Sequence, residues 1–166
     1  MKVLPLVSAL ALATSVAAPV AADNQNMVVY SHRDWDVRVV AWDDGTMACV
    51  AQVTYPDDSF AIWADRESPI RLQFYSSGWS FDDSAADLEV QIDGQAPWSL
   101  SNANLYKQSI LFDLPDSRSG TRFLSEVVYG NTLYLRDSAG RDVQNYSLAG
   151  SQASIAALTN CVDALK

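Results

Sequence analysis

The sequence predicts one mainly β domain, an antiparallel β-sandwich or partly open barrel, with a short helix near residues 121–129 and a C-terminal helix near 152–165. Apolar and polar residues alternate with a period of two from residue 28 to 148, which is typical of half-buried strands. Clusters of Asp, Gly, Ser and Pro interrupt this alternation and predict turns. Near the C-terminus a helical spacing replaces it. The chain has 166 residues, 49% of them hydrophobic, which is enough for one well-filled core.

The first strands are expected to form a hairpin. Residues 35–41 and 47–55 each alternate between an apolar and a more polar face, and Asp43-Asp44-Gly45-Thr46 between them is typical of a tight turn. Residues 76–84 are expected to be loop-like. Further strands are expected over residues 60–64, 70–75, 88–92, 97–100, 105–112, 133–135 and 143–148.

Two segments break the period of two. Apolar residues near helical spacing predict a short helix over 121–129, and Gly130 is well placed to be its C-cap. After Gly150, Ser151 is expected to cap a second helix. The apolar face of this helix is expected to consist of Ile155, Leu158, Val162 and Leu165.

The N-terminus matches the layout of a secretory signal. In residues 1–22, Lys2 precedes an apolar run that ends in small residues, so we expect cleavage after Ala22. A retained membrane helix is the alternative, but the run is short and interrupted. Cleavage would leave one periplasmic domain over 23–166, with 23–26 as a short tail and no membrane segment.

The two cysteines, Cys49 and Cys161, are expected to form a disulfide, because cysteines of exported proteins are usually paired. The bond would fasten the C-terminal helix to an early strand, whose Cys49 face would then be the core face. A closed zinc site would need more ligands than these cysteines and the single histidine, His32, provide. No Cys-x-x-Cys sequence suggests redox exchange.

Composition argues against several function classes. A net charge of −9 would repel nucleic-acid phosphates. His32 is the only candidate base of a hydrolase triad, and no Gly-x-Ser-x-Gly elbow accompanies it. The glutamates Glu67, Glu89 and Glu126 show no pairing typical of a glycosidase. We therefore expect no enzyme, no catalytic residues and no cofactor.

Three acidic pairs fall in expected turns. They are Asp43-Asp44, Asp57-Asp58 and Asp82-Asp83. Aspartate is favoured in turns because its side chain accepts hydrogen bonds from the following backbone, and the spacing does not match an EF-hand. We expect no metal site, although a calcium ion remains an alternative if two of these turns meet.

Aromatic residues are the most suggestive functional feature, with five tryptophans and seven tyrosines in the chain. Trp35 continues a buried alternation and is expected in the core. Trp63 and Tyr75 lie opposite the apolar faces of their strands, and Trp79 and Trp98 lie beside turns. If these four side chains are exposed and contiguous, they form a binding surface, because aromatic rings anchor protein interfaces and stack on sugars. Core packing is the alternative.

Short motifs spread along the chain resemble a known family. They are Asp34-Trp35-x-Val37, Cys49-Val50-Ala51-Gln52, Val90-x-Ile92-Asp93-Gly94 followed by Pro97-Trp98, Phe123-Leu124, Gly130-Asn131-Thr132-Leu133, and Tyr146-Ser147-Leu148-Ala149-Gly150-Ser151 before Cys161. In order and spacing the chain resembles the invasion-associated locus B type of proteobacterial envelope protein and its uncharacterised relatives. The resemblance implies an exported β-sandwich-like domain with a C-terminal helix, an association with the cell envelope and, for the namesake, a contribution to host-cell invasion. It implies no catalytic residues.

Two functions follow as hypotheses. The first is a non-enzymatic periplasmic interaction module that binds an envelope or secreted protein through one sheet face or an edge strand. The alternative is a small-ligand or carbohydrate-binding domain that uses the same surface aromatics.

Overall fold

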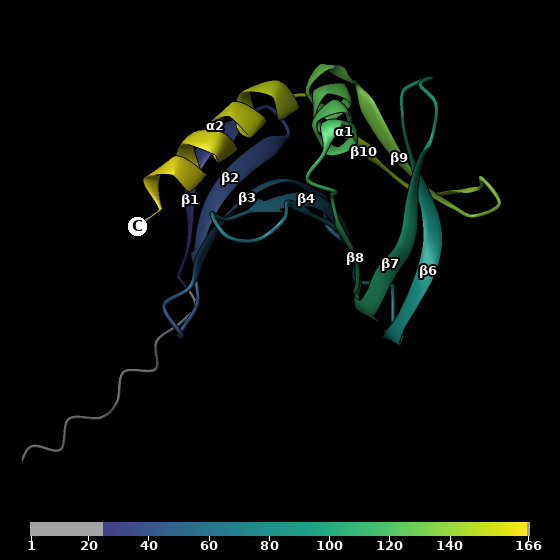
Figure 1. Ribbon diagram of the computed structural model, residues 1–166, viewed down its shortest axis with the longest axis horizontal. Coiled ribbons are helices and arrows are strands. Elements are labelled where there is room, and N and C mark those ends of the chain that lie inside the picture. The colour runs from purple at the N-terminus through teal and green to yellow at the C-terminus, as the bar shows by residue number, and fades with distance from the viewer. Residues whose placement is uncertain (1–24, 166) are drawn as a thin grey trace, which may run out of the picture.

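A computed structural model describes residues 25–165, and the expected signal peptide with its cleavage after Ala22 lies outside them. Ten antiparallel strands form one open sheet in the order β1-β2-β3-β4-β5-β8-β7-β6-β9-β10, with two helices beside it (Figure 1). The predicted fold class is confirmed. The strands are β1 (Gln25–His32), β2 (Trp35–Ala41), β3 (Met47–Thr54), β4 (Asp58–Ala64), β5 (Arg71–Ser76), β6 (Phe81–Ile92), β7 (Trp98–Lys107), β8 (Ser109–Asp113), β9 (Thr132–Asp137) and β10 (Asp142–Ser147). The helices are α1 (Arg118–Tyr129) and α2 (Ser151–Ala164).

The predicted hairpin is present as β2 and β3, in a register that pairs Val39 with Cys49. The face that carries Cys49 is the core face, as expected. The expected tail over 23–26 is corrected in part, because Gln25 and Asn26 already pair with β2 as the first residues of β1. Backbone pairing with a neighbouring strand can order a segment that lacks a regular apolar pattern.

The middle of the sheet differs from the expected strand limits. The strand expected over 88–92 begins earlier, at Phe81, and β7 is continuous through the gap expected before residue 105. The pairing register between β6 and β7 shifts twice, and these irregularities interrupt the alternation of apolar and polar residues by which strands are predicted. Asn102 has a positive φ of 57°, and its backbone N–H donates to Oδ1 of Asp87.

Helix α1 ends at Gly130, as predicted, but for a different reason. The φ of Gly130 is −79°, so the left-handed conformation of a usual glycine C-cap is not used. A Cβ atom here would lie 2.5 Å from Cγ2 of Ile92 and 2.9 Å from Cδ1 of Leu148. Glycine is therefore required because α1 packs closely against the sheet.

Helix α2 corrects one expectation and confirms another. Its N-cap is Gly150 rather than Ser151, and the buried Ser151 hydroxyl instead donates to the carbonyl oxygen of Val127 in α1 at 2.8 Å. Its expected apolar face does meet the core: Leu158 and Leu165 are buried, and Ile155 and Val162 are half-buried and pack against the main core. The fully buried positions of the helix are Ser151, Ser154, Leu158 and Cys161. The helix is oriented by Cys161, which must meet β3.

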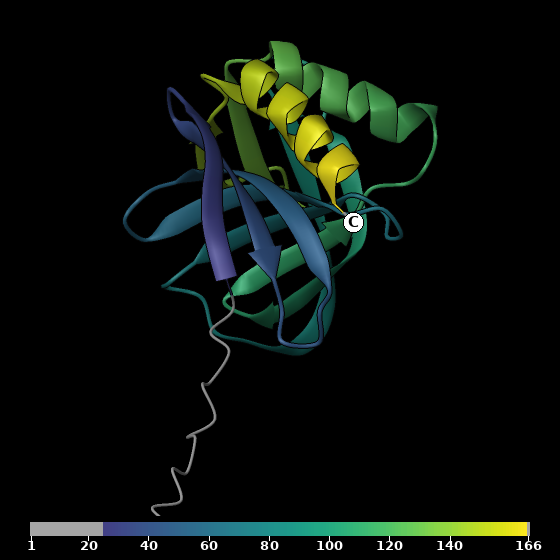
Figure 2. The same cartoon turned by 90° about the vertical axis from the view of Figure 1, so that its left-hand side faces the viewer.

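Both helices lie over the same end of the curved sheet, where they cover the core (Figures 1 and 2). An aromatic cluster of Trp35, Phe60, Phe74 and Tyr146 occupies the centre of this core. Burial raises the pKa of the Tyr146 hydroxyl. Neither helix is long and apolar enough to cross a membrane, within the described residues.

The two ends of the sheet meet without pairing as strands. The indole N–H of Trp35 donates to the carbonyl oxygen of Ser147 at 2.9 Å, and the Ser147 hydroxyl donates to Oδ2 of Asp34 at 2.5 Å. The backbone N–H of Asp34 donates to the carbonyl oxygen of Ala149. The turn between β1 and β2 is thereby fixed to the end of β10. These hydrogen bonds hold the first and last strands near each other, although the two strands do not pair.

Candidate functional site

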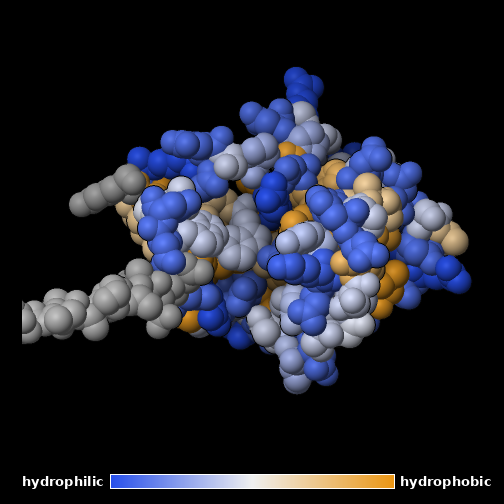
Figure 3. All heavy atoms as spheres, turned by 90° about the horizontal axis from the view of Figure 1, so that it is seen from below, coloured by the Kyte–Doolittle hydropathy of each residue, from blue (hydrophilic) through white to orange (hydrophobic). Residues whose placement is uncertain are grey.

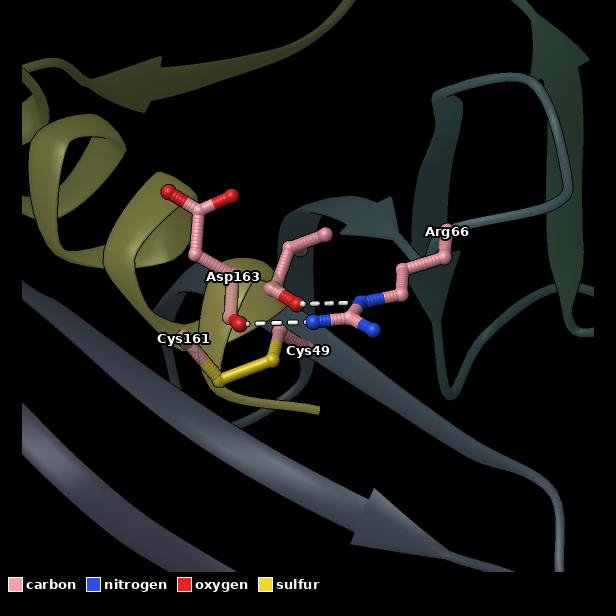
Figure 4. The surroundings of a disulfide bond; sticks show 5 residues. Cys49, Arg66, Cys161 and Asp163 are labelled. Atoms are coloured by element: carbon pink, nitrogen blue, oxygen red, sulfur yellow. Dashed lines mark hydrogen bonds between the residues drawn. A yellow bond between two sulfur atoms is a disulfide. The ribbon is translucent and has the colours of Figure 1, made fainter. Parts of the chain in front are cut away.

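The predicted disulfide between Cys49 and Cys161 is confirmed, with Cα atoms 6.1 Å apart (Figure 4). Arg66 makes a second link between the sheet and the end of α2. Its guanidinium donates to the carbonyl oxygens of Val162 at 3.3 Å and Asp163 at 2.7 Å. A cation is favourable here because it meets the unpaired carbonyls of a helix C-terminus. These two links fix the end of α2 to β3 and to the loop after β4.

A groove with a volume of about 550 Å³ lies between β1 and α2. Most of its lining is apolar. Met27, Val29 and Tyr30 contribute from β1, and Val39 and Met47 from the following hairpin. Residues of the last turns of α2 form the opposite wall. The disulfide therefore also builds this groove, because Cys161 is part of that wall.

A bulge in β1 shapes the groove. Val28 pairs with Arg38 and Tyr30 with Val37, which leaves Val29 as an extra residue. Met27 and Val29 remain 62% and 44% exposed. β1 is an edge strand of the sheet and carries no Asp, Glu, Lys or Arg, although natural edge strands are commonly protected by charged side chains.

The four aromatic residues of the predicted binding surface are all half-buried, and the structure does not bring them together. Trp63 and Tyr75 lie on the sheet face opposite the main core. Trp79 and Trp98 pack against the main core instead. Trp98 joins β7 to α1, because its indole N–H donates to Oε2 of Glu126 at 2.6 Å.

Trp63 lies in a smaller pocket of about 270 Å³ on this opposite face, together with Trp42. The two ring centroids are 6.2 Å apart. The Trp63 indole N–H donates to Oε1 of Gln73 at 2.7 Å, and the Gln73 amide donates to the Ser109 hydroxyl at 2.8 Å. Trp63 is thus held in one orientation, whereas Trp42 is 38% exposed.

Two charged residues line the rim of this pocket. The backbone N–H groups of Ser68 and Glu67 donate to Asp65 and lower the pKa of its carboxyl, so Asp65 is ionised at neutral pH. Arg71 donates two hydrogen bonds to Asp113, which raise the pKa of its guanidinium. The remaining N–H groups of Arg71 are not used in that pair.

The other candidate residues do not line either cavity. Asp44 accepts hydrogen bonds from the backbone N–H and hydroxyl of Thr46, as turn chemistry predicts. Within residues 25–165 no three His, Cys, Asp or Glu side chains are grouped as metal ligands. His32 is exposed, with its ring stacked on Tyr30.

The face seen from below is mainly hydrophilic, with small hydrophobic patches (Figure 3).

The chain matches no family model, no curated protein and no solved structure. Function must therefore be inferred from the two cavities. Sequence analysis missed Trp42, although it continues the outward-facing alternation of Val40. It also missed Met27 and Val29, because the bulge hides the face of β1 to which they belong.

Trp63 and Tyr75, the two predicted surface aromatics on the opposite face, are expected to differ in how much their truncation to alanine lowers stability. Trp63→Ala should lower the free energy of unfolding by about 2 kcal/mol, roughly half the cost at a fully buried site, because Trp63 packs on Val50 and Ala61. Tyr75→Ala should cost less than about 1 kcal/mol, because the half-buried Tyr75 belongs to neither hydrophobic cluster of the described residues. Urea denaturation measures both. Unchanged stability of the Trp63 variant would contradict its structural role.

Proposed function

We propose that the protein is an exported, non-enzymatic interaction module of the cell envelope, of the invasion-associated locus B type. The apolar N-terminus with Ala22 before the cleavage point supports export to the periplasm. The disulfide supports the same compartment, because disulfides persist in oxidising surroundings. The motifs quoted above support the family.

The observation that carries the proposal is the groove between β1 and α2. It places exposed apolar side chains beside an edge strand whose outer backbone groups pair with no other strand of the described residues 25–165. An extended peptide can use both features, with its backbone on the strand edge and alternate side chains in the groove. The partner is an apolar, extended segment of an envelope or secreted protein.

The groove provides a matched pair of variants. Val29 lines it, while Val28 is equally exposed, at 46% against 44%, and pairs with Arg38 outside it. The oxidised chain beginning at residue 23, with a photoreactive amino acid replacing Met27, is irradiated in envelope extract. Mass spectrometry then identifies the cross-linked peptides.

We expect cross-links to one apolar segment of one protein. Val29→Asp should abolish them, because it places a charge in the groove, and Val28→Asp should retain them. A reduced and alkylated chain should also lose them, because α2 is then released. Cross-links that survive Val29→Asp, or that vanish equally in both variants, would contradict the proposal.

A further inference from the structure

We propose that the pocket lined by Trp42 and Trp63 is a second binding site, which holds one neutral sugar ring of the pyranose type. It lies on the opposite side of the sheet from the groove, because Trp63 belongs to the outer cluster with Val50 and Ala61, whereas Cys161 belongs to the main core. The two sites can therefore be tested separately.

The sheet register explains why these side chains meet. Trp63 on β4 pairs with Arg71 on β5, and Gln73 on β5 pairs with Leu111 on β8. Residues in such positions point to one face, so three neighbouring strands contribute to a single floor. Trp42 follows β2 directly and closes one side, with the Asp65 loop on another.

The pocket lining provides the two kinds of group that a sugar ring requires, aromatic faces and hydrogen-bonding side chains. A pyranose has an apolar C–H face, which can stack on an aromatic ring, and a margin of hydroxyl groups. Trp42 and Trp63 provide the aromatic faces. Asp65 can accept hydroxyl hydrogen bonds at Oδ2, since both backbone donors contact Oδ1, and Arg71 can donate from its remaining N–H groups.

Charge disfavours an anionic ligand, and size favours a single ring. Asp65 and Asp113 outnumber the one cation, Arg71, and the whole chain carries −9, so an anionic ligand is disfavoured. The same negative charge would attract a cationic ligand, so the test includes choline as a cationic probe. The volume of about 270 Å³ is below the usual range for drug-sized ligands and suits one ring better than a chain.

The test uses the oxidised protein and five probes: glucose, galactose, mannose, N-acetylglucosamine and choline. Binding is followed by tryptophan fluorescence and by the NMR signals of the five indole N–H groups. We expect saturable binding of at least one sugar, with a dissociation constant of about 1 mM, as is usual for so small a ligand. The Trp42 and Trp63 signals should shift, and those of Trp35 and Trp98 should not.

Two variants control this result. Trp42→Ala should weaken sugar binding at least about tenfold, equivalent to about 1.4 kcal/mol. Tyr129→Ala removes an exposed ring, 75% accessible, that lies outside the pocket, and it should leave binding unchanged. The absence of saturable sugar binding, binding of choline alone, or shifts confined to other tryptophans would overturn the proposal.

Discussion

Removing the disulfide by the double substitution Cys49→Ala and Cys161→Ala is expected to lower the free energy of unfolding by about 4–5 kcal/mol. The bond closes a loop across 112 residues, and in the chain-entropy model a loop of about 100 residues contributes about 4.7 kcal/mol. Small domains have a total stability of about 5–15 kcal/mol, so this loss is a large fraction. Urea denaturation of both proteins measures it.

Wild-type protein measured under reducing conditions is the control for this experiment. It lacks the cross-link but keeps both sulfur atoms, so it separates the effect of the bond from the effect of the cavities that alanine leaves. We expect it to lose most of the same stability. If the reduced protein is as stable as the oxidised one, the unfolded chain gains no freedom from reduction, and the proposed role of the bond is wrong.

The second large effect is expected at Gly150, where alanine should cost about 2–5 kcal/mol. Gly150 has a φ of +107°, which is unfavourable for alanine by about 1–2 kcal/mol. A Cβ atom would also lie 2.3 Å from the carbonyl oxygen of His32, and overpacking of this kind costs about 1–3 kcal/mol. Thermal and urea denaturation measure the combined loss.

Gly45→Ala is a matched control for Gly150→Ala. Gly45 also has a positive φ, +85°, but no atom lies within 4 Å of its added Cβ. Its substitution should therefore show the conformational cost alone, about 1–2 kcal/mol. If both substitutions lower the free energy of unfolding equally, the close approach of Gly150 to His32 does not contribute to the cost.

The sequence predicted the structure correctly where a single local pattern determines it. The regular alternation in β2 and β3 predicted their hairpin, and the turn at Asp44 followed ordinary turn chemistry. The pairing of Cys49 with Cys161 was predictable because the chain has two cysteines. In these cases the local pattern and the tertiary structure require the same arrangement.

Prediction was less successful where distant contacts decide the outcome. The N-cap of α2 is Gly150 and not Ser151, because the buried Ser151 hydroxyl donates to the carbonyl oxygen of Val127 in α1. The bulge at Val29 and the positive φ of Asn102 leave no simple trace in the alternation. Neither cavity could be derived, because the groove depends on where α2 packs on the sheet, and the pocket includes Leu111 of β8, which pairs with β5 out of chain order.

The contact between the ends of the sheet also constrains when the protein can fold. Trp35 and Ser147 are 112 residues apart, so an elongating chain has its first strands long before the segment that completes them. Folding that relies on such distant contacts is slow, and unfinished sheets expose strand edges. A chain truncated before β10 would therefore be an aggregation-prone fragment and not a smaller domain.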